Sequence, residues 1–501
     1  MLAKRKIEKI LLIFPPSTEV SGGLRMCIPP LGIAYLGAVL RKDYQVRLLD
    51  TTAEGYDNVE ELGTGLVKYG LSYQKIKEKI SDYSPDLVGI TCLYSTQFPF
   101  VSKICHLIKE INSDMITAIG GYHPTFLAKE CLEKEKSIDF IVLGEGEHTF
   151  HDLLKQIEHG TDLTHLEGIA FRREDKLQIN PKTNYIENLD ELPFPARDLL
   201  PMEKYFSINI PMSITSKHKR CTSIATSRGC TARCVFCPSP NFWGHRYRAR
   251  SADNVLKELE LLIKDYQIKE IQFQDDNLIL DKKRAVEIFK GIIDRKLKLQ
   301  WNTPNGIALW KLDEQLLKLM SASGCYELTL AIESGDQEVL SKIIKKPLNL
   351  KRVEELTKII KNLGIETNSF FIVGFPGETK EQIRRTFGFA KKLNLDCSYF
   401  FIANPNPGSK LYEICKEKGY LKEDFDFETI DYFKSNYDTP EFTSQDLEKL
   451  RNREHVKFNL GLIYRNPIIF LKRHFNIIIT NPRGLYRSLI HRWLPFILNQ
   501  S

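Results

Sequence analysis

The chain has 501 residues, of which 42% are hydrophobic and 27% charged, and its formal net charge at pH 7 is +7. This length predicts two or three domains, and so mild a charge does not by itself indicate a nucleic acid partner. The eleven cysteines are an odd number at scattered positions, which argues against a disulfide framework and favours a reducing, cytoplasmic compartment. The sequence shows neither a signal-peptide core nor an apolar run long enough to span a membrane.

Strands alternate with helices over the first 150 residues. Nearly continuous apolar runs predict buried parallel strands, and apolar periodicity predicts the helices between them. The predicted strands cover residues 9–14, 46–49, 87–91, 115–119 and 140–143, and the helices cover about 29–40, 73–83 and 101–111. This alternation is typical of a doubly wound, Rossmann-like sheet, so we expect residues 1–150 to form one α/β domain.

The loops after these strands are the candidate pocket of the first domain, because ligands of open α/β sheets bind outside the carboxyl ends of the strands. Glycines there let the backbone approach a large ligand, and small polar groups can bind it; the same glycines could also serve as tight turns alone. The candidate residues are Ser95, Gly120, Gly121, His123, Pro124, Thr125, Gly144, Glu145 and Gly146.

A connector over residues 151–215 is predicted to follow. Residues 168–179 are typical of a hairpin with a charged turn. Prolines at 193 and 195 favour an extended path across the domain junction.

Six strand–helix units follow over residues 216–410. Their predicted strands cover residues 222–226, 268–273, 299–303, 326–332, 366–373 and 397–403. Parallel strands joined by helices close most readily into a barrel or part of one, with active-site loops at the carboxyl ends of the strands. The sequence therefore predicts a partial, TIM-like β/α barrel.

Three cysteines follow the first barrel strand at the spacing C-x3-C-x2-C: Cys230, Cys234 and Cys237. A loop this short brings three thiolates to one face, where they could hold three irons of a cubane cluster and leave the fourth iron open. A zinc knuckle completed by His245 and chance clustering remain the alternatives.

Polar or glycine residues also follow three of the other barrel strands. Asp275 and Asp276 follow the second strand, Glu333 and Ser334 follow the fourth, and Gly374 opens the turn after the fifth. Carboxylates at such positions could bind an ammonium, a ribose hydroxyl or a metal ion, or they could cap the next helix.

The cysteine motif, with Phe236 just before its third cysteine, resembles the signature of the radical S-adenosylmethionine (SAM) enzymes. The turns at 333–335, 374–379 and 407–409 are similar to the E-S-G, G-x-P-G-E-T and P-G-T turns of that family. The resemblance implies a 4Fe-4S cluster on the three cysteines, with SAM on the fourth iron. It implies SAM contacts from Phe236, Asp275, Asp276, Glu333, Ser334 and Gly374.

The first half resembles the cobalamin-binding domain of cobalamin-dependent radical SAM enzymes. The matching pieces are Pro29-Pro30-Leu31-Gly32 and the loops at 120–125 and 144–147. The resemblance implies that the nine candidate pocket residues contact cobalamin. The D-x-H-x-x-G motif is missing, which implies base-off cobalamin without a histidine on cobalt and places His123 in the loop or pocket wall.

The resemblance also implies the reaction. The reduced cluster cleaves SAM to methionine and a 5′-deoxyadenosyl radical, the radical takes hydrogen from an unactivated carbon, and methylcobalamin methylates that carbon. We expect a small-molecule or lipid-like substrate and a reducing partner such as flavodoxin or ferredoxin. Three alternatives stay open: a cobalamin-dependent radical SAM cyclase or rearrangement enzyme, a methylthiotransferase, and a non-catalytic cobalamin or redox sensor.

The last region, residues 411–501, is predicted to be helical and basic. From residue 451 onward it holds nine arginines and lysines against the single acid Glu454, with apolar residues between them. It could be a basic end cap, or an amphipathic surface for anionic lipid or a phosphorylated substrate, which would place the protein at the membrane periphery. Basic and aromatic residues do not alternate on a strand there, so nucleic acid is not expected.

Overall fold

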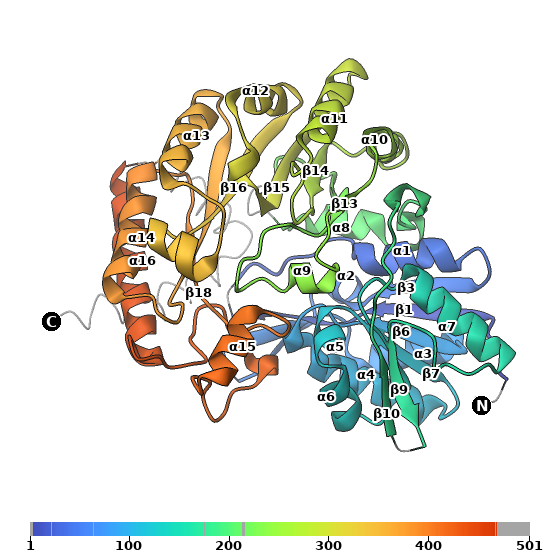
Figure 1. Cartoon of the computed structure of the whole chain (residues 1–501). Helices are drawn as coiled ribbons and strands as arrows, with labels where there is room; N and C mark the ends of the chain where they lie inside the picture. The colour runs from blue at the N-terminus through green and yellow to red at the C-terminus, as the bar shows by residue number, and fades with distance from the viewer. Residues whose placement is uncertain are drawn as a thin grey trace.

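The computed structural model describes residues 4–465, apart from residues 22, 64, 175 and 213–215, together with residue 467. Two α/β units follow one another along the chain. The unit coloured blue to teal in Figure 1 is N-terminal, and the unit coloured yellow-green to orange is a curved sheet covered by helices.

The N-terminal unit has a seven-stranded sheet in the order β10-β9-β8-β7-β6-β1-β3. Its strands are β1 (Lys9–Phe14), β3 (Gln45–Asp50), β6 (Leu87–Thr91), β7 (Ile116–Gly120), β8 (Phe140–Val142), β9 (Ile169–Arg173) and β10 (Lys176–Asn180). The first five are parallel, and β9 and β10 add an antiparallel hairpin beside β8. The hairpin expected in the connector is thus part of this sheet, while the domain boundary at residue 150 stays a prediction.

Helices cover both faces of this sheet. They are α1 (Leu31–Leu40), α3 (Tyr73–Tyr83), α4 (Phe98–Ile111), α6 (Ala128–Lys134) and α7 (Glu147–His159). Along β1, Ile10 and Leu12 pack into one core cluster and Leu11 and Ile13 into another, because successive side chains point to opposite faces. The predicted doubly wound sheet is confirmed, and its strand order reverses between β1 and β6, where such sheets bind ligands.

A three-stranded antiparallel sheet, which the sequence did not predict, lies beside this unit. It consists of β2 (Ser17–Val20), β5 (Leu66–Tyr69) and β4 (Val59–Glu61). The other short elements are α2 (Thr51–Glu54), α5 (Tyr122–Phe126), α8 (Met202–Ile208), α9 (Ser239–Phe242), β12 (Ser227–Arg228) and β13 (Arg248–Ala249).

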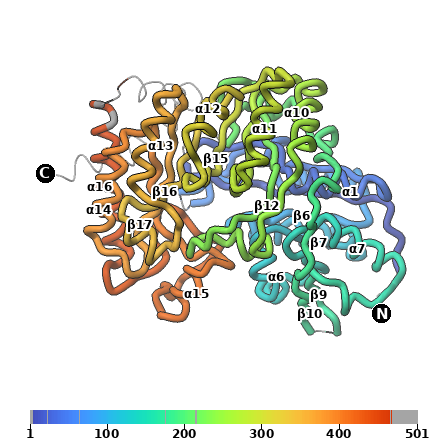
Figure 2. The backbone as a smooth tube through the Cα atoms, turned by 45° about the horizontal axis from the view of Figure 1, so that its top comes forward, coloured from blue at the N-terminus to red at the C-terminus, as the bar shows by residue number. Residues whose placement is uncertain are grey.

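The second unit is a partial barrel of six parallel strands in chain order, with β11 and β18 at its edges. The strands are β11 (Cys221–Ile224), β14 (Glu270–Phe273), β15 (Gln300–Ile307), β16 (Cys325–Glu333), β17 (Glu366–Val373) and β18 (Tyr399–Ile402). The helices are α10 (Ala252–Tyr266), α11 (Lys282–Asp294), α12 (Glu314–Ala322), α13 (Leu350–Asn362) and α14 (Lys380–Leu393). Both views show these helices on the outside of the sheet (Figures 1 and 2), so the predicted partial barrel is confirmed.

Alternation along the strands separates an outer face from an inner face. Trp301 stacks on Phe289 of α11 with ring centroids 4.9 Å apart, so the neighbouring Asn302 points inward. At the amino-terminal end of the barrel, the inner Glu270 accepts hydrogen bonds from the backbone N–H groups of Lys217 and His218, at 2.7 and 2.8 Å. That end is therefore tied to the connector, and the strand ends with the candidate site residues lie at the other end.

The chain then continues through α15 (Lys410–Glu417) to α16 (Ser444–Arg465), which lies along α14 and β18 (Figure 1). Phe458 of α16 packs on Phe400 of β18, with ring centroids 5.2 Å apart. In the part of the chain that the structure describes, no helix has the length and apolar character needed to cross a membrane.

Candidate active site

The three cysteines lie in a loop that begins just after β11. Strands β12 and β13 pair antiparallel at its base, so the chain leaves and returns at one point. Gly229 enters the loop with φ +84°, and a Cβ there would lie 2.1 Å from the carbonyl oxygen of Arg246. The position before Cys230 therefore requires glycine.

Hydrogen-bond donors face the sulfur of Cys230. The backbone N–H of Ala232 lies 3.5 Å from this Sγ, and Nδ2 of Asn277 lies 3.7 Å from it. Burial raises the pKa of the Cys234 thiol to about 11, against the opposing charge of Lys346. Burial also raises the pKa of the Cys237 thiol. A bound metal deprotonates such thiols, and hydrogen bonds to sulfur are one means of tuning iron–sulfur clusters.

Within the described ranges, no three His, Cys, Asp or Glu side chains lie close enough to share one metal ion. In a cubane cluster each thiolate binds its own iron, so three cysteines of one loop can serve a cluster without converging on a point.

Asp275 and Asp276 hold the cysteine loop. Asp275 accepts hydrogen bonds from the Thr226 hydroxyl at 2.6 Å and from the Ser227 hydroxyl. Asp276 accepts one from the Ser239 hydroxyl at 2.6 Å, and burial raises the pKa of its carboxyl. Neither carboxylate caps the following helix α11, whose N-cap is Asp281.

Glu333 ends β16 with φ +68°, a left-handed conformation that is uncommon for a residue other than glycine. Its carboxylate pairs with Nζ of Lys346 at 2.9 Å, and both side chains are buried. The ammonium also lies 5.6 Å from the ring centroid of Trp310. Lys346 follows a π-helical turn (Val339–Ile344) whose last carbonyl accepts the backbone N–H of Val235, so the pair adjoins the cysteine loop. The sequence did not single out Lys346, because it occupies no recognisable motif.

The turn after β17 is held by a buried carboxyl group. Oε2 of Glu378 accepts the N–H groups of Gly374 at 2.6 Å and Phe375 at 3.1 Å. Tyr437 donates its hydroxyl hydrogen to the carbonyl of Gly374 at 2.6 Å. Burial raises the pKa of Glu378 to about 8. The ring of Phe236 lies 6.0 Å from that of Phe375, so this turn also contacts the cysteine loop.

Ser334 is fully buried, and its hydroxyl lies 3.1 Å from the Thr386 hydroxyl and accepts the N–H of Asp336. Its side chain is therefore used within the fold.

In the N-terminal unit, the loops after β6 and β7 are joined through His123. Nδ1 of this residue lies 2.9 Å from the Ser95 hydroxyl, and its ring lies 4.8 Å from that of Phe98. Burial lowers the pKa of His123 to about 4, so the imidazole is neutral at pH 7. Gly121 has φ +115°, and a Cβ there would lie 2.5 Å from the carbonyl oxygen of Cys92. The predicted loop or wall position of His123 agrees with these contacts.

The next loop continues the same edge. Thr125 donates to the carbonyl of Gly121 at 2.6 Å and accepts the N–H of Gly144 at 3.0 Å. Pro124 is buried, whereas Gly120 at the end of β7 and Gly146 just before α7 are half-buried. The nine candidate residues therefore lie at the carboxyl end of one sheet.

Glu145 and Glu147 join this edge to the cysteine loop. Oε1 of Glu145 accepts from Arg228 and from Arg248, at 2.7 Å each, and Arg228 also pairs with Glu147. Burial of these groups is nearly complete. The carboxylate of Glu145 thus faces the barrel, and the sequence did not indicate the two arginines that bind it.

Comparisons with known proteins agree with this arrangement. A family model of the B12 binding domain matches residues 20–154, and one of the radical SAM superfamily matches residues 224–390. The cytidylyl-2-hydroxyethylphosphonate methyltransferase of Streptomyces wedmorensis is 37% identical over 447 residues, which is 83% of each chain. An uncharacterized methyltransferase of Pyrococcus horikoshii is 32% identical over 492 residues, covering 96% of this chain and 99% of that one.

The chain belongs to the cobalamin-dependent radical SAM methyltransferases. Its fold is similar to that of the radical SAM methyltransferase TsrM from Kitasatospora setae with cobalamin and a 4Fe-4S cluster bound. The TM-score is 0.67 at 19% identity, over 91% of this chain and 89% of that one. The predicted family, fold class and methyltransferase activity are confirmed, and so are the three cofactors: a 4Fe-4S cluster, SAM and cobalamin.

The residues of this methyltransferase fit those cofactors. One loop presents three cysteines, two donors face the sulfur of Cys230, and the buried Oδ1 of Asn277 beside them has no partner among the described residues. At the other edge, the left-handed turn at Gly121 and the neutral His123 lie at the carboxyl end of the parallel strands, where ligands of such sheets bind.

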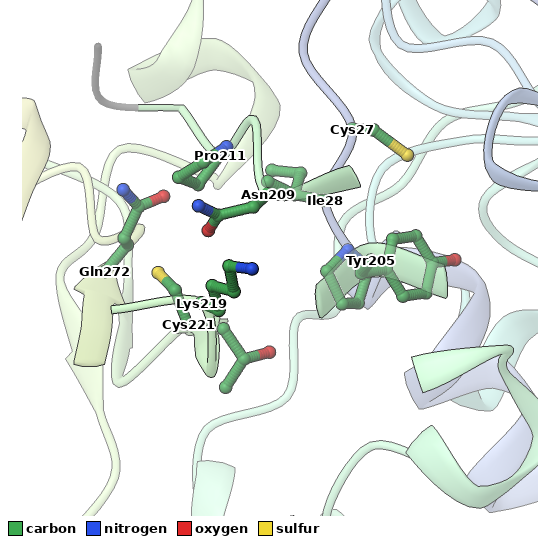
Figure 3. Close-up of a pocket in the computed structure, with 10 residues that line it drawn as sticks. Cys27, Ile28, Tyr205, Asn209, Pro211, Lys219, Cys221 and Gln272 are labelled. Carbon is green, nitrogen blue, oxygen red and sulfur yellow. The ribbon is translucent and has the colours of Figure 1, made fainter. Parts of the chain in front are cut away.

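A small cavity of about 10 Å³ lies elsewhere, between the connector and the beginning of the barrel (Figure 3). Cys27, Tyr205, Lys219 and Gln272 are among its lining residues, and Lys219 points across it. This volume holds about one water molecule. The cavity adjoins the start of β11, away from the cysteine loop, so it is not the substrate site of the methyltransferase.

The basic C-terminal surface remains a prediction. Of its residues, Arg451 is buried and donates to the carbonyl of Phe400 at 2.8 Å, so this arginine belongs to the packing of α16. Lys472, Arg473, Arg483, Arg487 and Arg492, with the apolar stretches between them, lie outside the described residues.

Proposed function

We propose that this methyltransferase adds a methyl group to an unactivated carbon of a small molecule. The observation that carries the proposal is the direct junction of two loops: Arg228, two residues before Cys230, is bound by Glu145 and Glu147 at the carboxyl edge of the N-terminal sheet. A reaction shared by two cofactors requires their sites to face one space, and this junction supports such an arrangement.

The site residues divide into three groups in this proposal. Cys230, Cys234 and Cys237 hold the cluster. SAM lies beside Phe236, Asp275, Asp276, Glu333, Ser334 and Gly374. Cobalamin lies against the edge with Ser95, Gly120, Gly121, His123, Pro124, Thr125, Gly144, Glu145 and Gly146. When bound, the cluster and SAM supply a radical that activates the substrate carbon, and cobalamin supplies the methyl group.

The protein's own groups position and enclose these molecules. Asp275 and Asp276 hold the base of the cysteine loop, and the Glu333 carboxylate holds the buried ammonium of Lys346 beside it. The neutral imidazole of His123 is held by Ser95 and Phe98, as a wall residue would be.

A cytidylyl-linked small molecule is the substrate class that we take from the relatives. The Streptomyces wedmorensis relative, 37% identical, acts by its name on cytidylyl-2-hydroxyethylphosphonate. The proposal includes a reducing partner such as flavodoxin or ferredoxin, since the cluster must receive an electron.

The test is SAM cleavage by the full chain, reconstituted without oxygen with iron, sulfide and cobalamin and then reduced. We expect 5′-deoxyadenosine and, with deuterated SAM, a labelled methyl group in the product. Cys230→Ala should abolish both, whereas Cys221→Ala, a cysteine in β11 outside the loop, should retain both. A protein with intact cluster and cobalamin spectra but no SAM cleavage would refute the proposal.

The same assay separates the rivals. A cyclase or rearrangement enzyme would form 5′-deoxyadenosine without transferring the labelled methyl group. A methylthiotransferase would transfer sulfur together with it, and a sensor would form neither product.

A further inference from the structure

The last turn of α16 exposes three large apolar side chains. Leu460 is 53% exposed, Ile463 36% and Tyr464 93%. Because Ile463 and Tyr464 lie three and four positions after Leu460, the three side chains are neighbours on the helix surface. Elsewhere in the part of the chain that the structure describes, exposed large apolar residues occur singly in the sequence or, at Leu93 and Tyr94, as a pair. This turn therefore concentrates exposed apolar surface at one place, and such surfaces mark sites of interaction.

The opposite face of α16 packs on the barrel. Phe458 is buried, and the buried Arg451 donates to the carbonyl of Phe400 at 2.8 Å. At 3.6 residues per turn, Leu460 and Tyr464 point away from the side on which Phe458 lies. The helix runs along the margin of the molecule, on the side away from the N-terminal unit (Figures 1 and 2). The exposed turn thus takes no part in the packing of α16 on the barrel.

Two exposed cations continue the outer face of α16 toward its start. Arg453 and Lys457 lie seven and three positions before Leu460, which places them on the same stripe of the helix. Lys457 pairs with Glu454 at 2.8 Å. Glu454 is the single acid from residue 451 to the end of the sequence. The outer face of the helix therefore combines apolar and cationic side chains, as segments that lie on a membrane surface do.

The sequence that follows α16 has the same combination. Residues 466–501 contain no aspartate or glutamate and supply +5 of the chain's net charge of +7. Apolar runs at 468–471 and 477–479 lie among the basic residues. These basic residues are Lys472, Arg473, Arg483, Arg487 and Arg492. Most of the net positive charge of the protein thus belongs to the stretch that directly follows the exposed apolar turn.

An anionic lipid bilayer matches both features. Its interface accommodates apolar side chains and the amphipathic ring of tyrosine, and its headgroups attract basic stretches. A nucleic acid would pair with the cations but would leave the apolar turn in water. An apolar protein surface would cover the turn but would leave the cations without counter-charges. Neither feature suffices alone, because stable attachment to a membrane surface requires apolar burial and electrostatic attraction together.

We propose that the last turn of α16 and the basic stretch that follows it bind the surface of an anionic lipid bilayer. Leu460, Ile463 and Tyr464 enter the interface, and the cations lie against the headgroups. The methyltransferase is then attached to the membrane surface without spanning the bilayer. This inference is independent of the proposed function, because neither SAM nor cobalamin takes part in the contact.

The test is co-sedimentation of the reconstituted full chain with vesicles of phosphatidylcholine, either alone or with about one third phosphatidylglycerol. We expect at least tenfold tighter binding to the anionic vesicles, and weaker binding as added salt screens the charges. The uncharged double variant L460Q/Y464Q should weaken binding to anionic vesicles at least tenfold. The matched control Ile293→Gln, at an exposed apolar position of α11, should change it less than twofold. Equal binding to both kinds of vesicle, or equal effects of the two glutamine variants, would overturn the inference.

A charge variant covers a folding failure of L460Q/Y464Q. R483Q/R487Q/R492Q removes three cations from the basic stretch, so it should reduce the preference for anionic vesicles at least tenfold. The control K283Q/K290Q/K318Q removes the same charge from exposed positions of α11 and α12 and should retain the preference. A retained preference in the arginine variant would reject the proposal.

Two further measurements separate the other outcomes. Absent vesicle binding, together with a dimer in analytical ultracentrifugation that L460Q/Y464Q abolishes, would reject the proposal and show that a second copy of the chain covers the turn. SAM cleavage is measured on the same samples without vesicles. Normal cleavage without vesicle binding would reject this inference alone, whereas absent cleavage by the wild type would reject the proposed function.

Discussion

Arg228 and Glu145 join the two halves of the molecule, with Nη1 of the arginine 2.7 Å from Oε1 of the glutamate. The contact links two loops that are 83 residues apart in the sequence. Arg228 also lies over Tyr35 and Trp243, at 5.6 and 5.3 Å from the ring centroids. Because both charges are buried, the pair restricts how the loop before Cys230 can move relative to the N-terminal sheet.

Replacing Arg228 should uncouple SAM cleavage from methyl transfer. In Arg228→Gln the buried Glu147 carboxylate loses its partner, at a cost of about 3–5 kcal/mol, so the two loops separate. We expect 5′-deoxyadenosine to form while methylated product falls about tenfold or more. Pulsed electron paramagnetic resonance should show a longer or broader distance between reduced cluster and cob(II)alamin.

Two further variants control this experiment. The double variant R228Q/E147Q should recover part of the stability, because it removes the unpaired carboxylate. Arg246→Gln breaks an exposed pair with Glu187 next to the same loop and should change neither readout, since exposed pairs contribute about 0–1 kcal/mol. A normal distance and a normal product ratio in Arg228→Gln would disprove the coupling role.

Lys346 should raise the reduction potential of the cluster. Lys346→Met removes a buried positive charge beside the loop of Cys230 and Cys234, so adding an electron becomes less favourable. We expect the midpoint potential to become more negative, with slower SAM cleavage at a fixed reductant potential. Redox titration followed by the cluster signal measures this.

The matched control is Lys342→Met. Lys342 lies in the π-helical turn before Lys346 and pairs with Glu338 on the surface, with side-chain exposures of 74% and 58%. The midpoint potential of the cluster in Lys342→Met should equal that of the wild type. An unchanged potential in Lys346→Met, with the cluster fully loaded, would contradict the prediction.

Glu378 should make the protein less stable as pH rises from about 4.5 to 8. Burial raises the pKa of this carboxyl from 4.5 to about 8, with Asp336 adding to the shift. The folded protein therefore retains a proton that the unfolded chain releases. Its contribution to the free energy of unfolding is fully present below pH 4.5 and falls by ~1.4 kcal/mol per pH unit until about pH 8.

Glu378→Gln isolates this group, because the amide oxygen can still accept the N–H groups of Gly374 and Phe375 but does not titrate. Burial also raises the pKa of Asp50, to about 6. This group lowers the stability of the wild type and of Glu378→Gln equally as pH rises, so its effect cancels when the two pH profiles are subtracted. Urea unfolding between pH 5 and 8 is the measurement. Parallel pH profiles for the two proteins would show that Glu378 does not hold the proton.

The fold could be predicted because its signals are local. Residues 366–373 were expected as a strand from their apolar pattern, and β17 has those bounds. The cysteine spacing likewise located the loop after β11. The Arg228–Glu145 and Lys346–Glu333 pairs could not be predicted in this way. They depend on how segments that are distant in the sequence pack together. Apolar periodicity marks buried apolar positions, but it marks neither a buried charged residue nor the residue that pairs with it.

The same limit applies to Asp275 and Asp276. Their position after a strand could be predicted from the sequence. The hydroxyl groups that donate hydrogen bonds to their carboxylates could not. The sequence predicts the hairpin β9–β10 within the connector, because a turn signal reveals a hairpin but not the strand that lies beside it. Only the pairing of β9 with β8 shows that it extends the first sheet.

Gly229 should be required for cluster assembly rather than for folding. Gly229→Ala would combine the strain of φ +84° with a Cβ 2.1 Å from a carbonyl oxygen, so the chain before Cys230 must shift. We expect a folded protein whose iron content after reconstitution falls at least severalfold.

The control is Gly364→Ala. Gly364 has φ +72° and nothing within 4 Å of an added Cβ, so this variant has the backbone strain of about 1–2 kcal/mol without the collision. It should load iron normally. Iron and sulfide analysis beside circular dichroism decides the outcome, and full loading of Gly229→Ala would show that the cysteine loop tolerates a different entry.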